Sequence, residues 1–325
     1  MGFVEDELLE VKKLCEHVIP NTKLVSCVPT MVRTEIKKTQ FKHIILCAQF
    51  SKEYPSSPLL IELKSKTLSE NLLLRLTSVC EQELKKILGK PQILHLIKFI
   101  WKFIDENPLI SCYDEVKSLK KSLTVNDELK LKQKYSNIIL KVYNGEYYWT
   151  CKITIPNNYP ISSVDIQDVD TNFTQTFYKH MLAQAKEIAR KCVEPPLKRN
   201  PKDPPFEPSP SLEKTALFII DCVKRLPSEK CQFCNEICFQ KDPKLLEQDE
   251  NSARHIERVY CGHLFHQGCL LKYMRQPPFG NKKCVKCGDK IHHYKWSITD
   301  KMAETRWAHE QARERELQEV TEFFK

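Results

Sequence analysis

The chain has 325 residues, with 51 Lys and Arg against 42 Asp and Glu, which gives a formal net charge of +9. This length allows two or three ordinary domains with hydrophobic cores. No run of roughly 18 apolar residues occurs, and the N-terminus has acidic residues where a secretory signal peptide has basic ones. We therefore expect no membrane partner and a location in the cytoplasm and/or the nucleus.

The positive charge is spread along the chain with acidic residues interleaved, which is typical of solvated surfaces. Short basic clusters at residues 117–121 and 198–202 lack the arginine-rich or aromatic pattern of nucleic-acid-binding motifs, so nucleic acid is not the expected partner. Eight cysteines lie singly among hydrophobic residues, as expected of reduced, buried thiols rather than a disulfide framework. They are Cys15, Cys27, Cys47, Cys80, Cys112, Cys151, Cys192 and Cys222.

The first hundred residues predict a helix, a group of strands and two further helices. The leading helix spans about 5–17, and extended segments follow at 23–27, 31–36 and 41–50. Pro55 and Pro58 then fix a turn before a strand at 60–63. Gly89 and Pro91 separate two stretches with apolar residues at helical spacing. These apolar residues are Leu73, Leu76, Cys80, Leu84 and Ile87 in one stretch, and Leu96, Ile97, Ile100, Phe103 and Ile104 in the other.

The next hundred residues repeat this pattern. Residues 135–144 and 147–156 predict a hairpin that places Trp149, Cys151, Ile153 and Ile155 on one face. A second Tyr-Pro turn and a strand at 162–169 follow the hairpin. Helices are predicted from about 173 to 192, with Phe177 and Ile188 inward, and from 212 to 226. Between them, the proline-rich and charged segment 194–211 predicts an exposed, extended loop.

A helix, a strand meander, a Tyr-Pro turn and flanking helices resemble the RWD domain, a relative of the ubiquitin-conjugating fold that generally lacks its active site. The first copy has the family's YPxxP motif as Tyr54, Pro55 and Pro58, whereas the second has Ser163 in place of the last proline. Neither copy has the HPN-like tripeptide that accompanies the reactive cysteine of conjugating enzymes. The resemblance implies two RWD-like interaction domains, at 1–108 and 109–228. A generic α+β interaction domain is the alternative, with nearly the same function.

Eight metal-type ligands follow, in the order C-x2-C, C-x-H-x2-H-x2-C and C-x2-C. They are Cys231, Cys234, Cys261, His263, His266, Cys269, Cys284 and Cys287. Thiolates and imidazoles at such spacings are typical of tetrahedral structural zinc, and eight ligands suffice for two Zn²⁺ ions. A closed four-ligand site leaves no position for an activated water, so hydrolysis is not expected. Cys238 is a further candidate in this region, interpreted as a small apolar residue or spare thiol.

This ligand order, with the segment CGHLFHQGC at 261–269, resembles the RING domain in its variant with two central histidines. The resemblance implies interleaved pairing, with one zinc held by Cys231, Cys234, His266 and Cys269. The other zinc is then held by Cys261, His263, Cys284 and Cys287. Alternatives are a purely structural zinc module of the PHD or treble-clef kind, or a redox cysteine cluster; a PHD places its single histidine fifth, after four cysteines.

RING proteins bind a ubiquitin-charged conjugating enzyme and hold its thioester for attack by a lysine, without forming a covalent intermediate themselves. By motif position, the resemblance implies that Phe233, Tyr273 and Val285 contact the conjugating enzyme; filler beside the zinc sites is their other interpretation. Gly288 stands where many RING ligases have Arg or Lys after the last ligand, which indicates a ligase that is weak alone or dependent on a partner. The charged insert between Cys234 and Cys261 predicts a solvated excursion with a short helix.

After the RING-like segment, at 229–296, residues 297–325 predict a charged helix, with Trp307, Leu317, Val320 and Phe324 as an apolar stripe docked on its own domain. We therefore predict an α+β protein with two RWD-like domains, a cross-brace two-zinc RING and a C-terminal helix, an arrangement similar to the ligase subunits of the Fanconi anaemia complex. The expected activity is that of a RING-type E3 ubiquitin ligase with no nucleophile of its own, which recruits substrate or complex subunits through its RWD-like domains. A non-enzymatic adaptor is the alternative.

Overall fold

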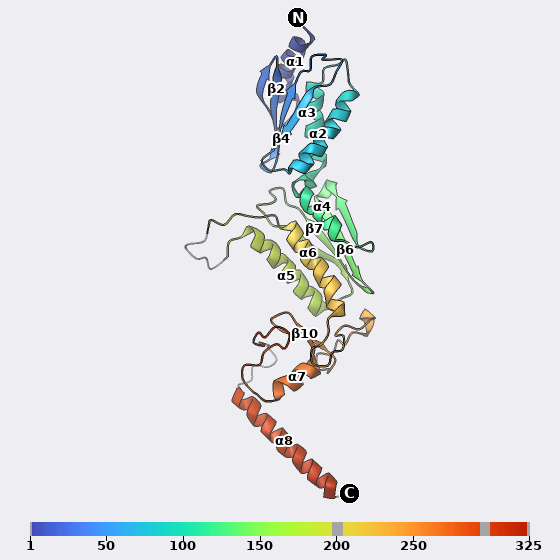
Figure 1. Ribbon diagram of the computed structural model, residues 1–325, viewed down its shortest axis with the longest axis vertical. Coiled ribbons are helices and arrows are strands. Elements are labelled where there is room, and N and C mark those ends of the chain that lie inside the picture. The colour runs from blue at the N-terminus through green and yellow to red at the C-terminus, as the bar shows by residue number, and fades with distance from the viewer. Residues whose placement is uncertain (1, 197–203, 293–299, 324–325) are drawn as a thin grey trace. The chain divides into compact units, whose positions relative to one another are not determined.

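The computed structural model describes residues 2–196, 204–292 and 300–323 (Figure 1). Contacts divide the chain into two units, one of residues 1–142, 150–171 and 179–220, and the other of residues 143–149, 172–178 and 221–325. Of the predicted proline-rich loop, 197–203 lie outside the described residues, and 204–211 form no regular structure. No helix in the described ranges is long and apolar enough to cross a membrane.

The N-terminal part has one antiparallel sheet with three helices, as predicted (Figure 1). Its strands pair in the order β1-β2-β3-β4, and in the central hairpin Ile36 lies opposite Ile44. The elements are α1 (Phe3–Val18), β1 (Thr22–Val28), β2 (Met31–Thr39), β3 (Lys42–Gln49), β4 (Leu60–Lys64), α2 (Glu70–Lys85) and α3 (Ile93–Glu106).

The core of this part follows from the period-two pattern of the strands and the helical pattern of α2 and α3. Ile44 and Leu46 in β3 are fully buried and alternate with half-buried residues, so one face of the strand points into the core. The most apolar helix, α3, contacts β2 and β3 and buries Leu96, Ile97 and Ile100 completely. Cys80 of α2 is also fully buried, and burial raises its pKa to about 12, as expected of a structural thiol.

A second four-stranded sheet follows, with strand order β5-β6-β7-β8. The predicted hairpin and helices are confirmed. The second strand of the hairpin buries Trp149, Cys151 and Ile153, and Ile155, which directly follows this strand, is also buried. The elements are η1 (Pro108–Cys112), α4 (Tyr113–Ser122), β5 (Glu128–Lys132), η2 (Gln133–Tyr135), β6 (Asn137–Asn144), β7 (Tyr147–Thr154), β8 (Asp165–Thr171), α5 (Gln175–Val193) and α6 (Leu212–Arg225).

Three details of this sheet and its helices differ from the prediction. Helix α4 and strand β5 were not predicted, because each is short and has few apolar residues; α4 buries only Val116 and Leu119 among its ten residues. In α5, Phe177 is buried as predicted, but Ile188 is only half-buried. The buried residues of the helix are mostly small, including Ala185 and Ala189, and small side chains give a weaker periodic signal than Leu or Ile.

The tyrosine of each Tyr-Pro turn joins a leading helix to the N-terminus of a later helix. In the first sheet region, the Tyr54 hydroxyl donates to Glu7 of α1 and accepts from the Gln92 N–H at 3.1 Å. The other carboxylate oxygen of Glu7 accepts from the N–H groups of Gln92 and Ile93, at 2.7 and 2.8 Å. The buried Glu7 therefore satisfies backbone donors at the start of α3 that no preceding turn can reach.

The second copy has the same arrangement. The Tyr159 hydroxyl donates to Glu115 of α4 and accepts from the N–H groups of Ser211 and Leu212, at 2.9 and 3.1 Å. Glu115 also accepts from the Glu213 N–H at 3.0 Å. Burial raises the pKa of both the Tyr159 hydroxyl and the Glu115 carboxyl. Each copy therefore uses a tyrosine and a glutamate to cap one helix.

The C-terminal part contains little regular structure. Its described elements are η3 (Leu226–Ser228), η4 (Pro243–Leu245), β9 (Ile256–Arg258), β10 (Leu264–His266), α7 (Gln267–Arg275) and α8 (Asp300–Phe323), and β9 pairs antiparallel with β10.

The insert before Cys261 agrees with its prediction in part. It carries a short helix, the 3-10 helix Pro243–Leu245, but it is not a fully solvated excursion, because Leu246, Ile256 and Val259 are buried. Strand β9, near the end of the insert, pairs with β10 and places Ile256 opposite His266.

The apolar stripe of α8 is not docked along its length. Leu317 and Val320 are 59% and 53% exposed, and only Trp307 makes a ring contact, with Phe279. Phe324, the last residue assigned to the stripe, lies outside the described residues.

Candidate metal centre

The first C-x2-C pair lies in a tight turn stabilised by its own backbone. The Cys231 N–H donates to the Glu236 carbonyl at 2.9 Å, and the Asn235 N–H donates back to the Cys231 carbonyl at 2.8 Å. Asn235 has φ +60°, a left-handed conformation that Asn and Gly adopt at low cost. A bridge between Lys230 and Ile237 closes the turn, which directs the two cysteine side chains to the same side.

The last C-x2-C pair repeats this geometry at the other end of the region. The Cys284 N–H donates to the Asp289 carbonyl, and the Gly288 N–H donates to the Cys284 carbonyl, both at 2.7 Å. Gly288 occupies the left-handed position with φ +81°, and a bridge between Lys283 and Lys290 closes the turn. The glycine that the sequence placed after the last ligand is therefore the residue that makes this turn.

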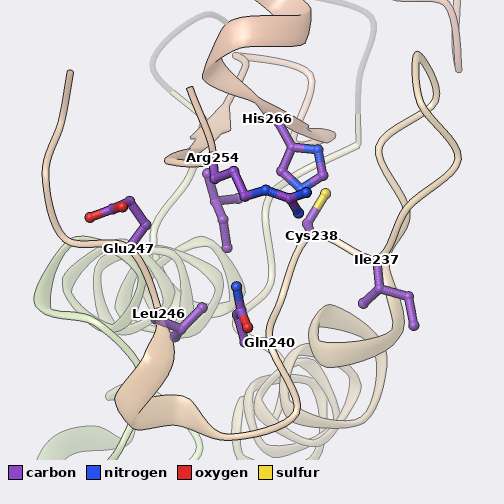
Figure 2. A pocket seen from close by; sticks show the side chains of 8 residues that line it. Ile237, Cys238, Gln240, Leu246, Glu247, Arg254 and His266 are labelled. Atoms are coloured by element: carbon purple, nitrogen blue, oxygen red, sulfur yellow. The ribbon is translucent and has the colours of Figure 1, made fainter. Parts of the chain in front are cut away.

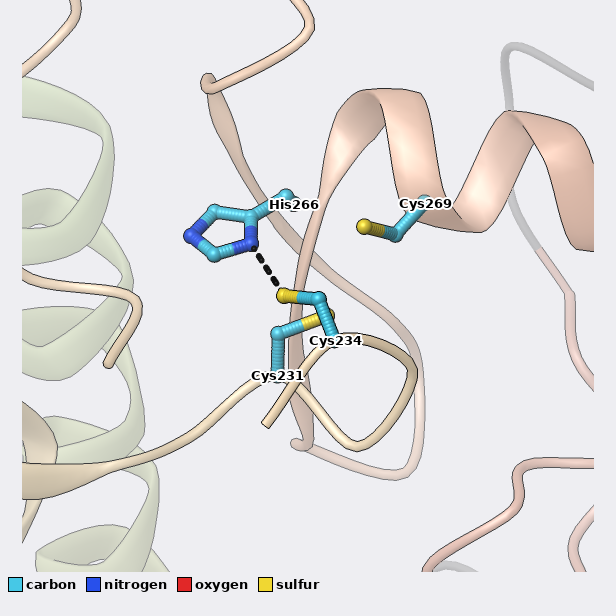
Figure 3. Close-up of side chains that lie close together, drawn as sticks. All are labelled: Cys231, Cys234, His266 and Cys269. Atoms are coloured by element: carbon cyan, nitrogen blue, oxygen red, sulfur yellow. Dashed lines mark hydrogen bonds between the residues drawn. The ribbon is translucent and has the colours of Figure 1, made fainter. Parts of the chain in front are cut away.

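The first candidate site joins the first turn to the middle segment (Figure 3). Cys231 and Cys234 come from the turn, His266 from the end of β10 and Cys269 from the first turn of α7. Their ligand atoms all lie within 4.8 Å of one another, and Nδ1 of His266 is 3.2 Å from Sγ of Cys234. The structure therefore brings together the four residues assigned to one zinc from the sequence.

The second candidate site joins the middle segment to the last turn. Cys261 and His263 precede β10, and Cys284 and Cys287 belong to the last turn. Nδ1 of His263 is 3.4 Å from Sγ of both Cys261 and Cys284, and the four ligand atoms again lie within 4.8 Å of one another. Because the two sites take alternate ligand pairs along the chain, they hold its segments together in an interleaved manner.

Both ligand sets fit structural zinc. Each offers three thiols and one imidazole nitrogen, the soft and borderline donors that zinc prefers. In a tetrahedral zinc site the ligand atoms are roughly 3.3 to 3.8 Å apart, and the sulfur–nitrogen distances here are close to that range. Burial lowers the pKa of His263 and of His266, which keeps both imidazoles in the neutral, metal-binding form. Each Zn²⁺ would crosslink the chain with no open position for chemistry.

Backbone N–H groups favour the thiolate form of the first cysteine in each turn. Burial by itself raises the pKa of Cys231, but hydrogen bonds from the backbone N–H groups of His266, Phe233 and Cys234 outweigh it and lower the pKa. The pKa of Cys284 is lowered in the same way by N–H groups of its own turn, against the effect of burial. A metal ligand must be deprotonated, so these turns prepare the sulfur for binding.

An ion-pair network fastens the two turns to each other. The side chain of Glu229, just before the first turn, is 4% exposed and pairs with Arg225. It also pairs at 3.3 Å with Lys286, which lies between the two cysteines of the last turn. Because this carboxylate is buried, the pairing satisfies a charge that is otherwise costly to remove from water.

The spare cysteine of the region, Cys238, lies outside both ligand sets. Its side chain faces a small pocket of about 160 Å³ that also includes Arg254 and the ligand His266 (Figure 2). Burial, followed by the nearby cysteines Cys231 and Cys234, raises the pKa of Cys238 to about 12. Cys238 is therefore a neutral buried thiol, in agreement with its interpretation as a small apolar residue.

An aromatic cluster lies next to the first site. The ring of Phe233 is 5.1 Å from that of Phe265, which is fully buried, and 4.9 Å from that of Tyr273. The Lys282 ammonium lies 4.4 Å from the centroid of the Tyr273 ring and donates to a backbone carbonyl. Phe233 and Tyr273 thus lie together, and Val285 in the last turn is 50% exposed.

The sequence interpretation did not identify Phe265 and Lys282 as part of this cluster. Phe265 lies between the ligands His263 and His266 in a strand whose three residues are all buried, and its place between two ligands could have indicated burial. Lys282 gave no usable signal, because a lysine is normally a surface residue and its contact with Tyr273 depends on the path of the loop.

Comparison with known families identifies part of the chain. The RWD domain family model matches residues 5–104, which is less than a third of the chain. The search of curated proteins found no match to the chain. The protein therefore has a mixed α/β fold with an N-terminal RWD domain and, in its C-terminal part, two cysteine–histidine clusters compatible with zinc. RWD domains mediate protein–protein interactions, including interactions with ubiquitin-conjugating enzymes, so this domain indicates an interaction role connected with the ubiquitin pathway.

Proposed function

We propose that the protein is a RING-type E3 ubiquitin ligase that acts in the cytoplasm or nucleus. In this proposal, residues 229–296 bind a ubiquitin-charged conjugating enzyme, and the N-terminal domains recruit a substrate or the subunits of a complex. The observation that carries it is the interleaving of the two Cys₃His clusters, with an aromatic cluster beside the first. Neither cluster has a free coordination position, which favours a binding role over hydrolysis.

The proposed mechanism is one of positioning. Phe233, Tyr273 and Val285 form the contact for the conjugating enzyme. Phe265 packs against Phe233, and the Lys282 ammonium lies over the Tyr273 ring, so these two residues hold the aromatic contact residues in place. Zinc would supply rigidity to this surface rather than chemistry. The rate of ubiquitin transfer then rises because the thioester and its ubiquitin are restricted to a reactive arrangement.

The residues after the RWD domain are proposed to form a second RWD-like domain, at 109–228. Two observations support this assignment. The second sheet has the same sequential strand order as the first, and Tyr159 with Glu115 reproduces the capping arrangement of Tyr54 with Glu7.

The second candidate function is a non-enzymatic adaptor in which the zinc clusters serve folding alone. Gly288 favours this alternative, because a ligase of this class usually has a basic residue after its last ligand and this turn has a glycine with φ +81°. An Arg or Lys at this position would have to adopt the left-handed backbone conformation of Gly288, at a cost of roughly 1–2 kcal/mol.

Discharge of ubiquitin from charged conjugating enzymes onto free lysine distinguishes the two functions. The full chain, loaded with zinc, is compared with Phe233→Ala, with Cys284→Ser and with the control Tyr260→Ala, which removes a side chain that is 82% exposed. We expect stimulation by the wild type and the control. Phe233→Ala should lose roughly tenfold or more of that stimulation while retaining its zinc, because an aromatic anchor carries much of the binding energy at such interfaces.

Cys284→Ser should lose both zinc and activity. A folded, zinc-loaded wild type that stimulates no conjugating enzyme in the panel would favour the adaptor. Stimulation that survives Phe233→Ala would contradict the proposed contact surface but not the ligase activity.

A further inference from the structure

A groove of about 350 Å³ lies where the RWD domain ends and the following segment begins. Its lining comes from α2, from the end of α3, from η1 and α4, and from β5 and η2. All of these residues belong to the same unit of the chain. No function proposed above uses this groove. Its lining residues, between Leu72 and Gln133, are far along the chain from the cysteine–histidine clusters, which begin at Cys231.

The floor of the groove is apolar. The rings of Phe103 and Tyr113 line it, and Leu131 of β5 is 37% exposed at its edge. Its buried apolar lining residues are Leu72, Leu109, Ile110 and Val116. A cavity of this size is within the range of protein binding pockets and accommodates one large apolar side chain with part of its backbone. A ligand that covers this surface removes apolar area from water, which favours binding.

Hydrogen bonds hold the walls in place. The side-chain oxygen of Gln133 accepts from the Leu109 N–H at 3.2 Å, which ties η2 to η1. The Asn107 side chain donates to the Phe103 carbonyl at 2.8 Å and so holds the end of α3. The groove is therefore formed before any ligand binds, which lowers the entropic cost of binding.

The rim of the groove is positively charged. Arg75, Lys117 and Lys120 line it with exposed side chains, and no acidic residue is among the lining residues. In the part of the chain that the structure describes, none of these three cations is in an ion pair; Arg75 lies 6.0 Å from the centroid of the Tyr113 ring. The rim thus presents charge that an acidic ligand would complement.

We propose that this groove binds an acidic segment of a partner protein that inserts one large apolar side chain. Charge complementarity selects an acidic ligand, and the apolar floor selects a peptide over a nucleic acid. A phosphate backbone would satisfy the three cations but would leave the floor uncovered, and nucleic-acid affinity normally depends on more extensive rows of Lys and Arg. The proposal goes beyond the ligase function and does not depend on it, because no zinc ligand contributes to the groove.

Selection from a phage-displayed library of random peptides on the zinc-loaded full chain tests the proposal. The variant Lys117→Glu/Lys120→Glu reverses two rim charges, and Lys85→Glu/Lys121→Glu makes the same change in net charge on exposed lysines outside the groove. A third variant, Leu131→Ser, removes the apolar edge. Circular dichroism establishes that each variant is folded, and fluorescence polarisation measures the affinity of the selected peptides.

We expect selected peptides rich in Asp and Glu around an aromatic or large aliphatic residue. Their affinity should fall roughly tenfold or more for the rim variant and for Leu131→Ser, and by less than about twofold for the control. Three outcomes would overturn the proposal. They are selection of no acidic peptides, equal binding by the rim variant and its control, and displacement of the peptides by a single-stranded oligonucleotide that binds more tightly at the same lysines.

Self-association is tested with the same variants by analytical ultracentrifugation. Concentration-dependent dimers that Lys117→Glu/Lys120→Glu abolishes and the control retains would assign the groove to a second copy of the chain, and would contradict a partner peptide. A wild type that remains monomeric while it binds the peptides supports the proposal.

Discussion

Gly268 has a steric role in placing a metal ligand. It lies in the first turn of α7, next to Cys269, and its N–H donates to the Ala253 carbonyl at 2.9 Å. A Cβ at this position would lie 2.9 Å from the Cβ of Ala253 and 3.2 Å from its carbonyl oxygen. The absence of a side chain therefore allows the insert to approach α7 and so sets the position of Cys269.

Gly268→Ala should weaken zinc binding at the first site. The added methyl group must push α7 away from Ala253, and overpacking of this kind costs roughly 1–3 kcal/mol. Competition with a chromophoric chelator measures zinc affinity directly. Gly2→Ala is the matched control, because a Cβ there meets nothing within 4 Å. Equal affinities for the two variants would show that α7 adjusts without moving its ligand.

At the scale of elements, the capping pairs connect segments that are far apart in the chain. Glu7 lies 85 residues from Gln92, and Glu115 lies 98 residues from Glu213. In each copy, one carboxylate and one tyrosine hydroxyl accept hydrogen bonds from N–H groups at the start of a helix. In α3 the N-cap residue, Gln92, makes no side-chain cap of its own. The two arrangements hold the leading helix, the Tyr-Pro turn and the later helix together.

Tyr54→Phe and Tyr159→Phe should each destabilise the protein. Tyr54→Phe removes the donor to one carboxylate oxygen of Glu7, while the Gln92 N–H keeps its hydrogen bond to the other oxygen. Tyr159→Phe removes the hydroxyl that accepts from the N–H groups of Ser211 and Leu212. Each buried group left unsatisfied costs about 1–3 kcal/mol. Thermal unfolding measures the change. Tyr135→Phe serves as the control, because that side chain is 63% exposed. A melting temperature no lower than that of the control would mean that water replaces the hydroxyl.

At the scale of the molecule, we expect the stability of the C-terminal part to depend on metal bound by the two cysteine–histidine clusters. Apart from α8, its described elements are short, and the two clusters join four segments of the chain between Cys231 and Cys287. Structural zinc contributes about 10–16 kcal/mol in zinc-finger peptides, which is comparable to the stability of a whole domain. The RWD domain instead has a core built from a sheet and three helices.

Removal of zinc with a strong chelator should therefore unfold residues 229–292 and leave the RWD domain folded. Limited proteolysis followed by mass spectrometry is the appropriate measurement. We expect cleavage between Cys231 and Cys287 and survival of a fragment that contains residues 5–104. Protection of the C-terminal part after complete removal of metal would contradict a structural role for zinc, and loss of the N-terminal fragment would show that its stability is coupled to the metal sites.

The sequence by itself determined the strands of the first sheet, three strands of the second sheet, most of the helices and the grouping of metal-type ligands. These features depend on local patterns, such as the alternation in β3 and β7 or the short spacing of Cys231 and Cys234, and a local pattern is visible without knowledge of the fold. Helix α4 and strand β5 were missed because each is short, and because α4 has only two buried residues and β5 has none, so neither gives a clear apolar pattern.

Only the tertiary structure decided which side chains meet over long separations. It assigned Glu7 and Glu115 to helix N-termini, placed Lys282 over Tyr273, and left Leu317 and Val320 of α8 exposed. It also formed the groove from helices and a strand whose residues give no common signal in the sequence. The reason is physical, since periodicity records which face of an element is apolar, whereas the partner of a polar or charged side chain depends on how the chain returns to it.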